Sequence, residues 1–280
     1  MQIAVILPAA GQSKRFNAAA GLNKSKLELD MAGKPVFMAA LDPFIKHPLV
    51  CQCIIAVDPD KVDSFKLKWG DLLGFHGVTV VPGGKIERWE TIKNAMAAVN
   101  DQATHIAVHD AARPLVSNEL ITRCFEAAKD YPAVIPGVSC SATLKRTAPL
   151  SDDEIQSKTD PLDAILGGAG KITVNVTKVT QTLDRSNVVL IQTPQVFERS
   201  LLQQAYASID SGTTDTKQIT DDAGLVEAMG QTVFVVDGEQ TNLKITEPAD
   251  YELAQLIAGA RKQTDAASLA KKRLFADDDD

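Results

Sequence analysis

Short apolar runs alternate with amphipathic stretches along most of this chain, and this alternation limits the folds that it can adopt. Runs rich in Val and Ile predict buried strands at residues 3–7, 53–57, 78–81, 105–108 and 133–136. Helical periodicity predicts helices at 36–45, 61–73, 88–99 and 118–129, with Ser117 as the N-cap of the last. Such alternation predicts an α/β fold with a mostly parallel sheet and helices on both faces. Ligands bind these sheets at the carboxyl ends of the strands, so motifs that follow strands are the candidate sites.

The pattern changes between residues 138 and 190, where polar, β-branched sequence predicts an extended arm. Within it, residues 151–170 combine clustered acids with several glycines and predict a flexible surface insertion. Regular α/β sequence resumes at 197–209, 221–229, 232–236 and 249–261. The expected organisation is an α/β domain from 1–137 and 191–262, an extended arm at 138–190, and a charged C-terminal tail at 263–280 whose end, 271–280, is expected to fray.

Composition is that of an ordinary globular protein and excludes several classes of function. Hydrophobic residues make up 45% of the chain and charged residues 23%. The net charge of -7 disfavours nucleic acid, so an anionic ligand needs a local cluster of Lys and Arg. No apolar stretch reaches the roughly 20 residues that span a bilayer. The first strand begins at Gln2, which leaves no room for a signal peptide, so we expect no membrane contact and a cytoplasmic location. The four cysteines lack the spacing of a zinc site and are expected to be reduced thiols.

The loop after the first strand has the character of a phosphate-binding loop. Small residues follow the strand directly, namely Pro8, Ala9, Ala10 and Gly11. They allow the backbone to approach a ligand, and exposed N–H groups there can hold phosphate oxygens. Arg15 and Lys26 add cations that suit phosphate. The spacing is neither that of a P-loop nor that of a dinucleotide fingerprint. A tight strand–helix turn with solvated lysines is the alternative interpretation.

Further motifs give this loop a family context. They are Gly33-Lys34-Pro35, Gly83-Gly84 with Arg88 and Thr91, 108–114 (VHDAARP), 192–197 (QTPQVF), 220–223 (TDDA) and 242–246 (NLKIT). In this order, over about residues 2–260, the sequence resembles the 2-C-methyl-D-erythritol 4-phosphate cytidylyltransferases of the non-mevalonate isoprenoid pathway. The resemblance implies a Rossmann-like nucleotidyltransferase fold. It also implies that CMP is transferred from CTP to this polyol phosphate with release of pyrophosphate.

Three features depart from the family pattern. Gln12-Ser13 fills the middle of the family's Gly-x-Gly-x-Arg loop, so Ser13 must adopt the backbone conformation of a glycine or the loop must shift. Residues 83–88 include one extra residue, and the acidic residue that helps to read the base in the family has no assigned counterpart. The insertion, at about 148–177, lies outside the motifs.

The implied reaction needs charge neutralisation and in-line positioning more than a general base, because a phosphate monoester is already an anionic nucleophile. The resemblance gives Arg15, Lys26 and Lys244 to the reacting phosphates, with Lys244 in a late strand segment. Mg²⁺ would arrive mainly through the CTP phosphates, with Asp110 near the ion or the substrate hydroxyls. Backbone groups of Ala9, Ala10, Gly83 and Gly84, with the Thr91 hydroxyl, would read cytosine. The acceptor would contact Asp110, Arg113, Thr193 and Asp221.

Structural interpretations of the same residues stay open. Asp110 could cap a turn and Arg113 could pair with it. Asp221 could be a charge at a helix N-terminus, and Thr193 could belong to a rigid turn before Pro194. His109 is expected to pack and hydrogen-bond locally rather than to take part in chemistry.

The resemblance also implies a homodimer in which an arm of one subunit reaches the active site of the other. Thr143 and Arg185 match the positions that hold the phosphate of the acceptor from the partner chain. Two other functions compete with this interpretation. One is a cytidylyltransferase for ribitol 5-phosphate, which has the same fold and nearly the same loop. The other is a non-catalytic regulator that kept a nucleotide-binding fold, although the combination of Arg15, Lys26, Asp110 and Lys244 argues against it.

Overall fold

A computed structural model describes residues 1–21, 25–151, 176–214 and 219–276 of the chain. The chain divides into two compact units. Unit 1 comprises Met1–Val138 and Ile191–Asp280, and unit 2 comprises Ser139–Leu190. The insertion expected at 148–177 lies mostly outside the described residues.

The sheet of unit 1 is mostly parallel, as predicted. Its strand order is β10-β7-β11-β6-β1-β4-β5, and β12 pairs with β7. The strands are β1 (Ile3–Ala9), β4 (Val50–Val57), β5 (Val78–Pro82), β6 (His105–Val108), β7 (Ala133–Ser139), β10 (Val189–Ile191), β11 (Gln195–Glu198) and β12 (Phe234–Asp237). Strand β1 is parallel to β4 and β6, whereas β11 is antiparallel to both β6 and β7. The parallel strands at the centre therefore end at one edge of the sheet, where the site is expected.

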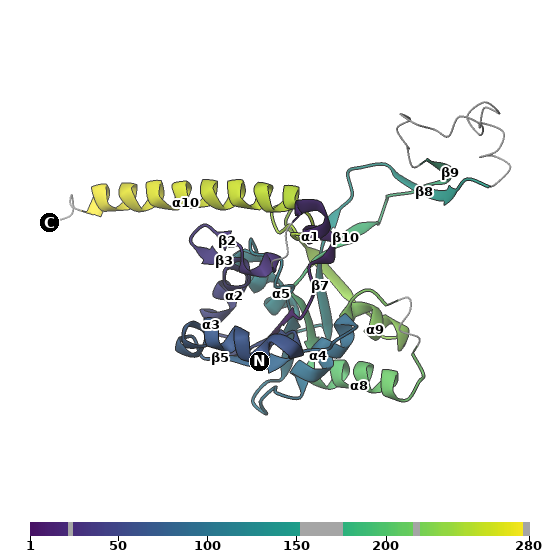
Figure 1. Cartoon of the computed structure of the whole chain (residues 1–280), viewed down its shortest axis with the longest axis horizontal. Coiled ribbons are helices and arrows are strands. Elements are labelled where there is room, and N and C mark those ends of the chain that lie inside the picture. The colour runs from purple at the N-terminus through teal and green to yellow at the C-terminus, as the bar shows by residue number, and fades with distance from the viewer. Residues whose placement is uncertain (22–24, 152–175, 215–218, 277–280) are drawn as a thin grey trace. The chain divides into compact units, whose positions relative to one another are not determined.

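Alternate residues of β1 divide the core between the two faces of the sheet. Ile3, Val5 and Leu7 face one cluster of buried side chains, and Ala4 and Ile6 face the other. The first cluster includes residues of α2, α3, α5 and α10, and the second includes residues of α4, α8 and α9 (Figure 1). The result is a three-layer arrangement that fixes the loops at the strand ends.

The helices follow the predicted periodicity closely. They are α1 (Lys14–Ala20), α2 (Val36–Ile45), α3 (Val62–Phe75), α4 (Arg88–Met96), α5 (Asn118–Ala127), α8 (Arg199–Asp210), α9 (Asp222–Ala228) and α10 (Pro248–Ala276). Short elements complete unit 1: η1 (Lys26–Glu28), η2 (Pro59–Lys61), β2 (Asp30–Met31) and β3 (Lys34–Pro35). Ser117 caps α5 by accepting a hydrogen bond from the backbone N–H of Leu120, as predicted.

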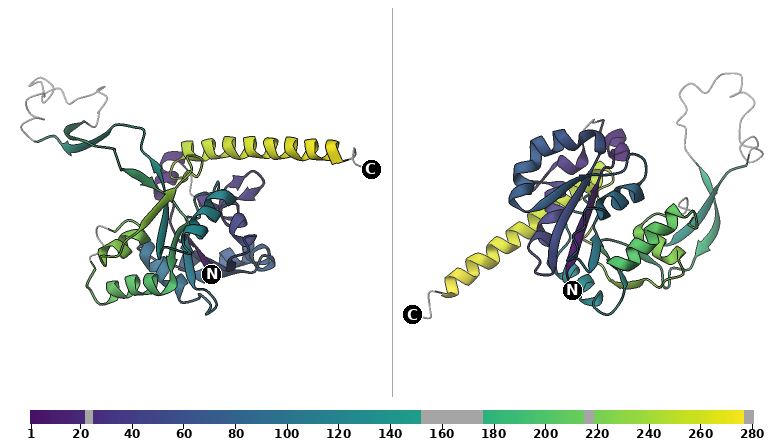
Figure 2. Two further views of the ribbon diagram at one scale, coloured as in Figure 1. Left: turned by 180° about the vertical axis from the view of Figure 1, so that it is seen from behind. Right: turned by 90° about the horizontal axis from the view of Figure 1, so that it is seen from below.

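Two segments differ from the sequence expectations. Regular α/β sequence was expected to resume at residue 197, but a strand, β11 (Gln195–Glu198), precedes helix α8 and pairs with strands on both sides. The charged tail, whose end at 271–280 was expected to fray, continues α10 as helix up to Ala276 (Figure 2). Its Ala-, Lys- and Leu-rich sequence favours helix, and that preference outweighs its charge. No helix in the described ranges is long and apolar enough to cross a membrane.

Unit 2 contains the arm. Strand β8 (Leu144–Pro149) runs antiparallel to β9 (Thr177–Leu183), with an irregularity in the register between Arg146 and Thr147. Several apolar side chains of this unit are exposed, among them Val176 and Val179. Extended strands are therefore present where polar, β-branched sequence predicted them.

Candidate active site

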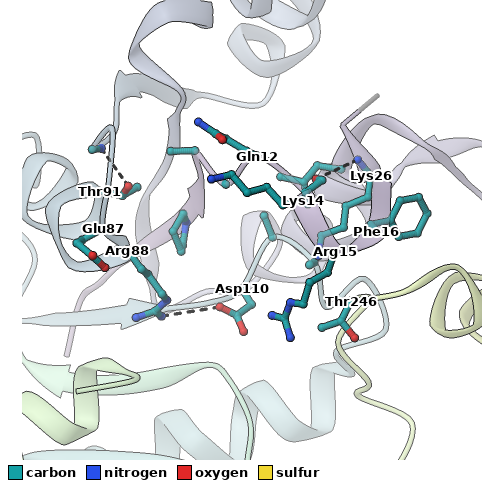
Figure 3. A pocket seen from close by; sticks show the side chains of 18 of the residues that line it. Gln12, Lys14, Arg15, Phe16, Lys26, Glu87, Arg88, Thr91, Asp110 and Thr246 are labelled. Atoms are coloured by element: carbon teal, nitrogen blue, oxygen red, sulfur yellow. Dashed lines mark hydrogen bonds and ion pairs between the residues drawn. The ribbon is translucent and has the colours of Figure 1, made fainter. Parts of the chain in front are cut away.

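A cavity of about 640 Å³ opens at the carboxyl ends of β1, β5 and β6. Its lining comes from residues 10–16 after β1, 84–88 between β5 and α4, and 110–112 after β6, together with Lys26, Lys244 and Thr246. Figure 3 shows Arg15, Arg88, Asp110 and Thr246 around the same space. The motifs that follow strands thus meet in one place, as the fold class predicted.

Ser13, which stands where the family has its second glycine, adopts a glycine-like backbone conformation in the loop after β1. Ser13 has φ 53° and ψ 28°, the left-handed conformation that favours glycine, and it stands at the N-cap of α1. Its carbonyl accepts a hydrogen bond from the N–H of Asn17 at 2.9 Å. A Cβ atom on Gly11 would meet nothing within 4 Å, so the backbone there is open to a ligand. Ser13 therefore tolerates the strained position, at a cost of about 1–2 kcal/mol.

Arg15 and Lys26 differ in their surroundings. Arg15 is exposed and makes no ion pair within the described part of the chain. Lys26 is half-buried, and its Nζ donates to the carbonyl of Ile245 at 2.5 Å. Burial, followed by the nearby charges of Lys244 and Arg15, lowers the pKa of Lys26 to about 8. An added negative charge such as a phosphate would relieve that crowding of cations.

Asp110 is the carboxylate on which the cations converge. Its Oδ2 lies 2.8 Å from Lys244 Nζ and 3.5 Å from Arg113 Nε, and its Oδ1 lies 3.8 Å from Arg88. Burial alone would raise the pKa of Asp110, but the charges of Lys244 and Arg88 hold it well below its ordinary value. Asp110 is therefore a charged, fixed group at the wall of the cavity.

Lys244 does not lie in a strand as expected. The segment 242–246 has no regular secondary structure, because its backbone bonds go to two loops instead of a neighbouring strand. The N–H of Ile245 donates to the carbonyl of Ala112 at 2.8 Å, and the carbonyl of Ile245 accepts from Lys26. Asp250 holds the other end of the segment by accepting from the N–H of Thr246 at 2.8 Å. These bonds place Lys244 at the wall of the cavity.

The glycine pair after β5 is packed closely against α4. A Cβ atom on Gly84 would lie 2.3 Å from Glu90 Cβ, so a side chain at this position would displace the helix. The N–H of Gly84 donates to the buried hydroxyl of Thr91 at 3.0 Å. Glu90 forms a reciprocal capping box with Glu87 at the start of α4. The N–H of Gly84 is thus engaged within the protein, and Thr91 shapes the loop. Reading of the base by these groups stays a prediction.

Several residues predicted to contact the acceptor have structural contacts within the protein. The Thr193 hydroxyl accepts from the N–H of Asp110 at 3.1 Å and lies 3.0 Å from His109 Nδ1. Arg113 donates to the carbonyl of Asn242 at 2.7 Å as well as facing Asp110. Asp221 caps α9 by accepting from the N–H of Gly224 at 3.0 Å. The structural interpretations of these residues therefore describe their present contacts, and a direct contact with the acceptor stays a prediction.

His109 is a packing residue, as expected. Its Nε2 lies 3.2 Å from the carbonyl oxygen of Arg113, and its ring packs against Phe44 with centroids 4.9 Å apart. Burial lowers its pKa to about 4, so the ring is neutral at neutral pH. The cavity accordingly has no histidine base of ordinary basicity at this point.

Arg88 is a site residue that sequence reasoning placed in a motif but gave no role. It lies at the start of α4, lines the cavity and donates to Asp222 Oδ2 at 2.8 Å. The hydroxyl of Tyr206 donates to the other oxygen of Asp222 at 2.5 Å. Asp222 belongs to the 220–223 motif but was given no role, and Tyr206 lies in α8, so no local spacing linked either residue to Arg88.

Thr143 and Arg185 both belong to unit 2 and lie at the same end of its hairpin. Leu144 pairs with Leu183, which brings the residues just beyond them together. Arg185 donates to the carbonyl of Ser141. The arm therefore presents the two residues predicted to hold the acceptor on one local surface.

Asp110 suits an ion that is already bound to a ligand better than a free ion. No group of three or more His, Cys, Asp or Glu side chains that could hold a metal occurs among the described residues. The oxygens of Asp110 already face cations. A divalent ion would thus take most of its ligands from a phosphate substrate.

Comparisons with known proteins agree with this geometry. The sequence model of the family IspD, 2-C-methyl-D-erythritol 4-phosphate cytidylyltransferase, matches residues 3–160 and 164–260. The enzyme of that name from Bacteroides thetaiotaomicron is 34% identical over 260 residues, covering 92% of this chain and 100% of the relative. The bifunctional enzyme IspD/IspF of Desulfotalea psychrophila is 32% identical, and the match covers 93% of this chain but 58% of that protein.

Solved structures give the same result. The crystal structure of 2-C-methyl-D-erythritol 4-phosphate cytidylyltransferase from Thermus thermophilus has a TM-score of 0.65 and 27% identity, covering 92% of this chain and 99% of that one. The crystal structure of the enzyme of the same name from Francisella tularensis has a TM-score of 0.67 and 26% identity, covering 91% of this chain and 99% of that one. Together with the cations gathered at the carboxyl ends of the parallel strands, these matches show that the chain belongs to the 2-C-methyl-D-erythritol 4-phosphate cytidylyltransferase family.

Proposed function

We propose that this chain transfers CMP from CTP to 2-C-methyl-D-erythritol 4-phosphate and releases pyrophosphate. Membership of the family supports this function. The observation that carries it is the convergence of Arg15, Lys26 and Lys244 on one cavity at the ends of the parallel strands. Cations from three separate segments surround a space large enough for a nucleotide.

The chemistry asks for what this cavity contains. An oxygen of the acceptor phosphate attacks the α-phosphorus of CTP, and the bond from that phosphorus to the bridging oxygen of pyrophosphate breaks. Arg15 and Lys26 would neutralise the charge that develops on the phosphates, and Lys244 would act from the opposite wall. No proton has to leave the nucleophile near neutral pH, so the neutral, buried His109 has no part in the step.

A divalent cation, Mg²⁺ by its preference for phosphate oxygen, completes the proposed site. When bound, it would neutralise charge on the triphosphate. Asp110, a carboxylate that lines the cavity, would lie near the ion, and the ion would replace part of its pairing with Lys244. The small number of carboxylates predicts weak binding of Mg²⁺ in the absence of nucleotide.

The acceptor site is proposed to be shared between two copies of the chain. Thr143 and Arg185 would hold the phosphate of the acceptor from the arm of the partner, since a guanidinium can bind phosphate through two hydrogen bonds. The exposed valines of the arm are consistent with a surface that a second copy covers. A homodimer follows from this arrangement.

One experiment distinguishes the proposed function from the two competing functions, a ribitol 5-phosphate cytidylyltransferase and a non-catalytic regulator. Purified protein is incubated with Mg²⁺, CTP and either methylerythritol phosphate or ribitol 5-phosphate, and pyrophosphate release is followed. We expect turnover with methylerythritol phosphate and about a hundredfold lower kcat/KM with ribitol 5-phosphate, because ribitol 5-phosphate is one carbon longer, lacks the methyl group and brings one more hydroxyl into the same acceptor site. Faster turnover with ribitol 5-phosphate would reassign the acceptor. Nucleotide binding without turnover on either acceptor would favour the regulator.

A further inference from the structure

A line of buried polar groups runs from α8 to the cavity. Tyr206 donates to Asp222 Oδ1 at 2.5 Å, and Arg88 Nη1 donates to Asp222 Oδ2 at 2.8 Å. Arg88 Nη2 then lies 3.8 Å from Oδ1 of Asp110. Tyr206 is 2% exposed and Asp222 is 1% exposed, so water does not compete for the hydrogen bond between them.

The charges along this line alternate in sign. Burial alone would lower the pKa of Arg88, but the carboxylates of Asp222 and Asp110 raise it above its ordinary value. Burial and the neighbouring carboxylate of Asp222 raise the pKa of Tyr206, so its hydroxyl remains a donor. A buried carboxylate with both oxygens bonded has one stable orientation, and a planar guanidinium anchored through Nη1 has its Nη2 aimed in one direction.

This orientation matters because Asp110 has a different partner on each oxygen. Arg88 faces Oδ1, while Lys244 and Arg113 face Oδ2. If Arg88 were free to move, it could close on Asp110 and compete with Lys244 for the carboxylate. Lys244 would then lose its fixed place at the wall of the cavity.

We propose that Asp222 and Tyr206 are positioning residues, which act through Arg88 to fix Asp110 and Lys244 for the reacting phosphates. The proposal rests on the proposed transfer of CMP, because it gives those two side chains a role in that reaction. It assigns a function to one side chain of α8 and one of α9, neither of which lines the cavity. The packing of three helices against one face of the sheet thereby bears on the charge arrangement of the site.

The test is a double-mutant cycle read in kcat/KM for CTP and in melting temperature. Tyr206→Phe removes one hydroxyl and is expected to lower kcat/KM about three- to tenfold, and Asp222→Asn about thirtyfold or more. In an Arg88→Met background, neither substitution should lower kcat/KM further by more than about twofold, because the route to Asp110 is already broken. Tyr131→Phe, the same change at a half-exposed tyrosine, is the matched control and should leave kcat/KM unchanged.

A merely structural role predicts a different pattern. Melting temperatures would fall while kcat/KM per folded molecule stays the same, or the losses would multiply in the Arg88→Met background, and either result overturns the proposal. If Asp222→Asn does not fold, Tyr206→Phe and its double variant decide the question. The dissociation constant of MgCTP, measured by calorimetry for the same single and double variants, provides a second readout of the cycle that does not depend on turnover. If the substitutions weaken MgCTP binding non-additively but the protein shows no turnover, the proposed function is rejected and the positioning role is not. If the protein is active but the losses in kcat/KM are additive, the positioning role is rejected and the proposed function is not.

Discussion

The lowered pKa of Lys26 predicts how the enzyme responds to pH. With a pKa of about 8, the free enzyme holds Lys26 about nine-tenths protonated at pH 7 and about one-tenth protonated at pH 9. Since the triphosphate needs the cation, kcat/KM for CTP should fall about tenfold between these values. Lys26→Arg should move this basic limb upward by at least about one pH unit, because a guanidinium stays charged.

The assay is pyrophosphate release at subsaturating CTP, constant ionic strength and saturating acceptor. Lys34→Arg serves as the control, because Lys34 is exposed and pairs with Asp42 outside the cavity. Asp250→Asn should shift the limb of the wild type downward, since the charge of Asp250 raises the pKa of Lys26. A profile that stays flat to pH 9.5, or an unchanged limb in Lys26→Arg, would refute the reasoning.

Unfolding of the protein at alkaline pH would also lower activity. The direction in which the free energy of unfolding changes with pH distinguishes unfolding from deprotonation of Lys26. The pKa of Lys26 is lower in the folded protein than in the unfolded chain, so the unfolded chain binds more protons between about 8 and 10.5. The contribution of Lys26 to the free energy of unfolding therefore rises across this window while activity falls. Denaturant unfolding at pH 7, 8 and 9, compared with Lys26→Met, isolates that contribution.

The remaining predictions concern the loop, the ion and the dimer. Arg15→Ala and Lys26→Ala should each lower kcat at least about a hundredfold, with the circular dichroism spectrum unchanged. A near-normal kcat in both variants would show that the triphosphate does not bind at these residues. Ser13→Gly should raise the free energy of unfolding by up to about 1 kcal/mol in urea titration, because relief of the left-handed strain exceeds the entropy cost of glycine. Chelation should abolish activity and Mg²⁺ restore it, and calorimetry should show weak Mg²⁺ binding without nucleotide. Hybrid dimers of Lys26→Ala and Arg185→Ala chains, mixed with free exchange, should recover about a quarter of wild-type activity, whereas no recovery would place both residues in one subunit's site.

The sheet and its main helices were predictable because their signals are local. Alternating apolar residues in β1 serve both faces of the sheet, and Ser117 forms a cap with a residue three positions away. Strand β11 was not predicted, because its four residues stand directly before helix α8 and are too few to give a periodic signal. Its position between β6 and β7 is set by pairing with strands that lie far away in the chain.

The cations of the site were predictable for a similar reason. Arg15 and Lys26 follow the first strand in a segment whose small residues indicate close approach of a ligand. Lys244 was predicted from its motif, but the loop that carries it was mistaken for a strand, because the Ile245 bonds that shape it reach Ala112 and Lys26. Contacts between loops leave no periodic signal in the sequence.

The motif residues outside the cavity show what resemblance alone does not supply. A motif identifies which residues belong together, but it does not distinguish a ligand contact from a support. Thr193 holds the backbone of Asp110, and the side chain of Asn242 donates to the carbonyl of Thr193 at 2.9 Å. Arg113 joins Asn242 to Asp110 from the other side. Removing any member leaves a buried polar group without its partner, so loss of activity at these positions would follow from displacement of Asp110 even where no atom touches the substrate.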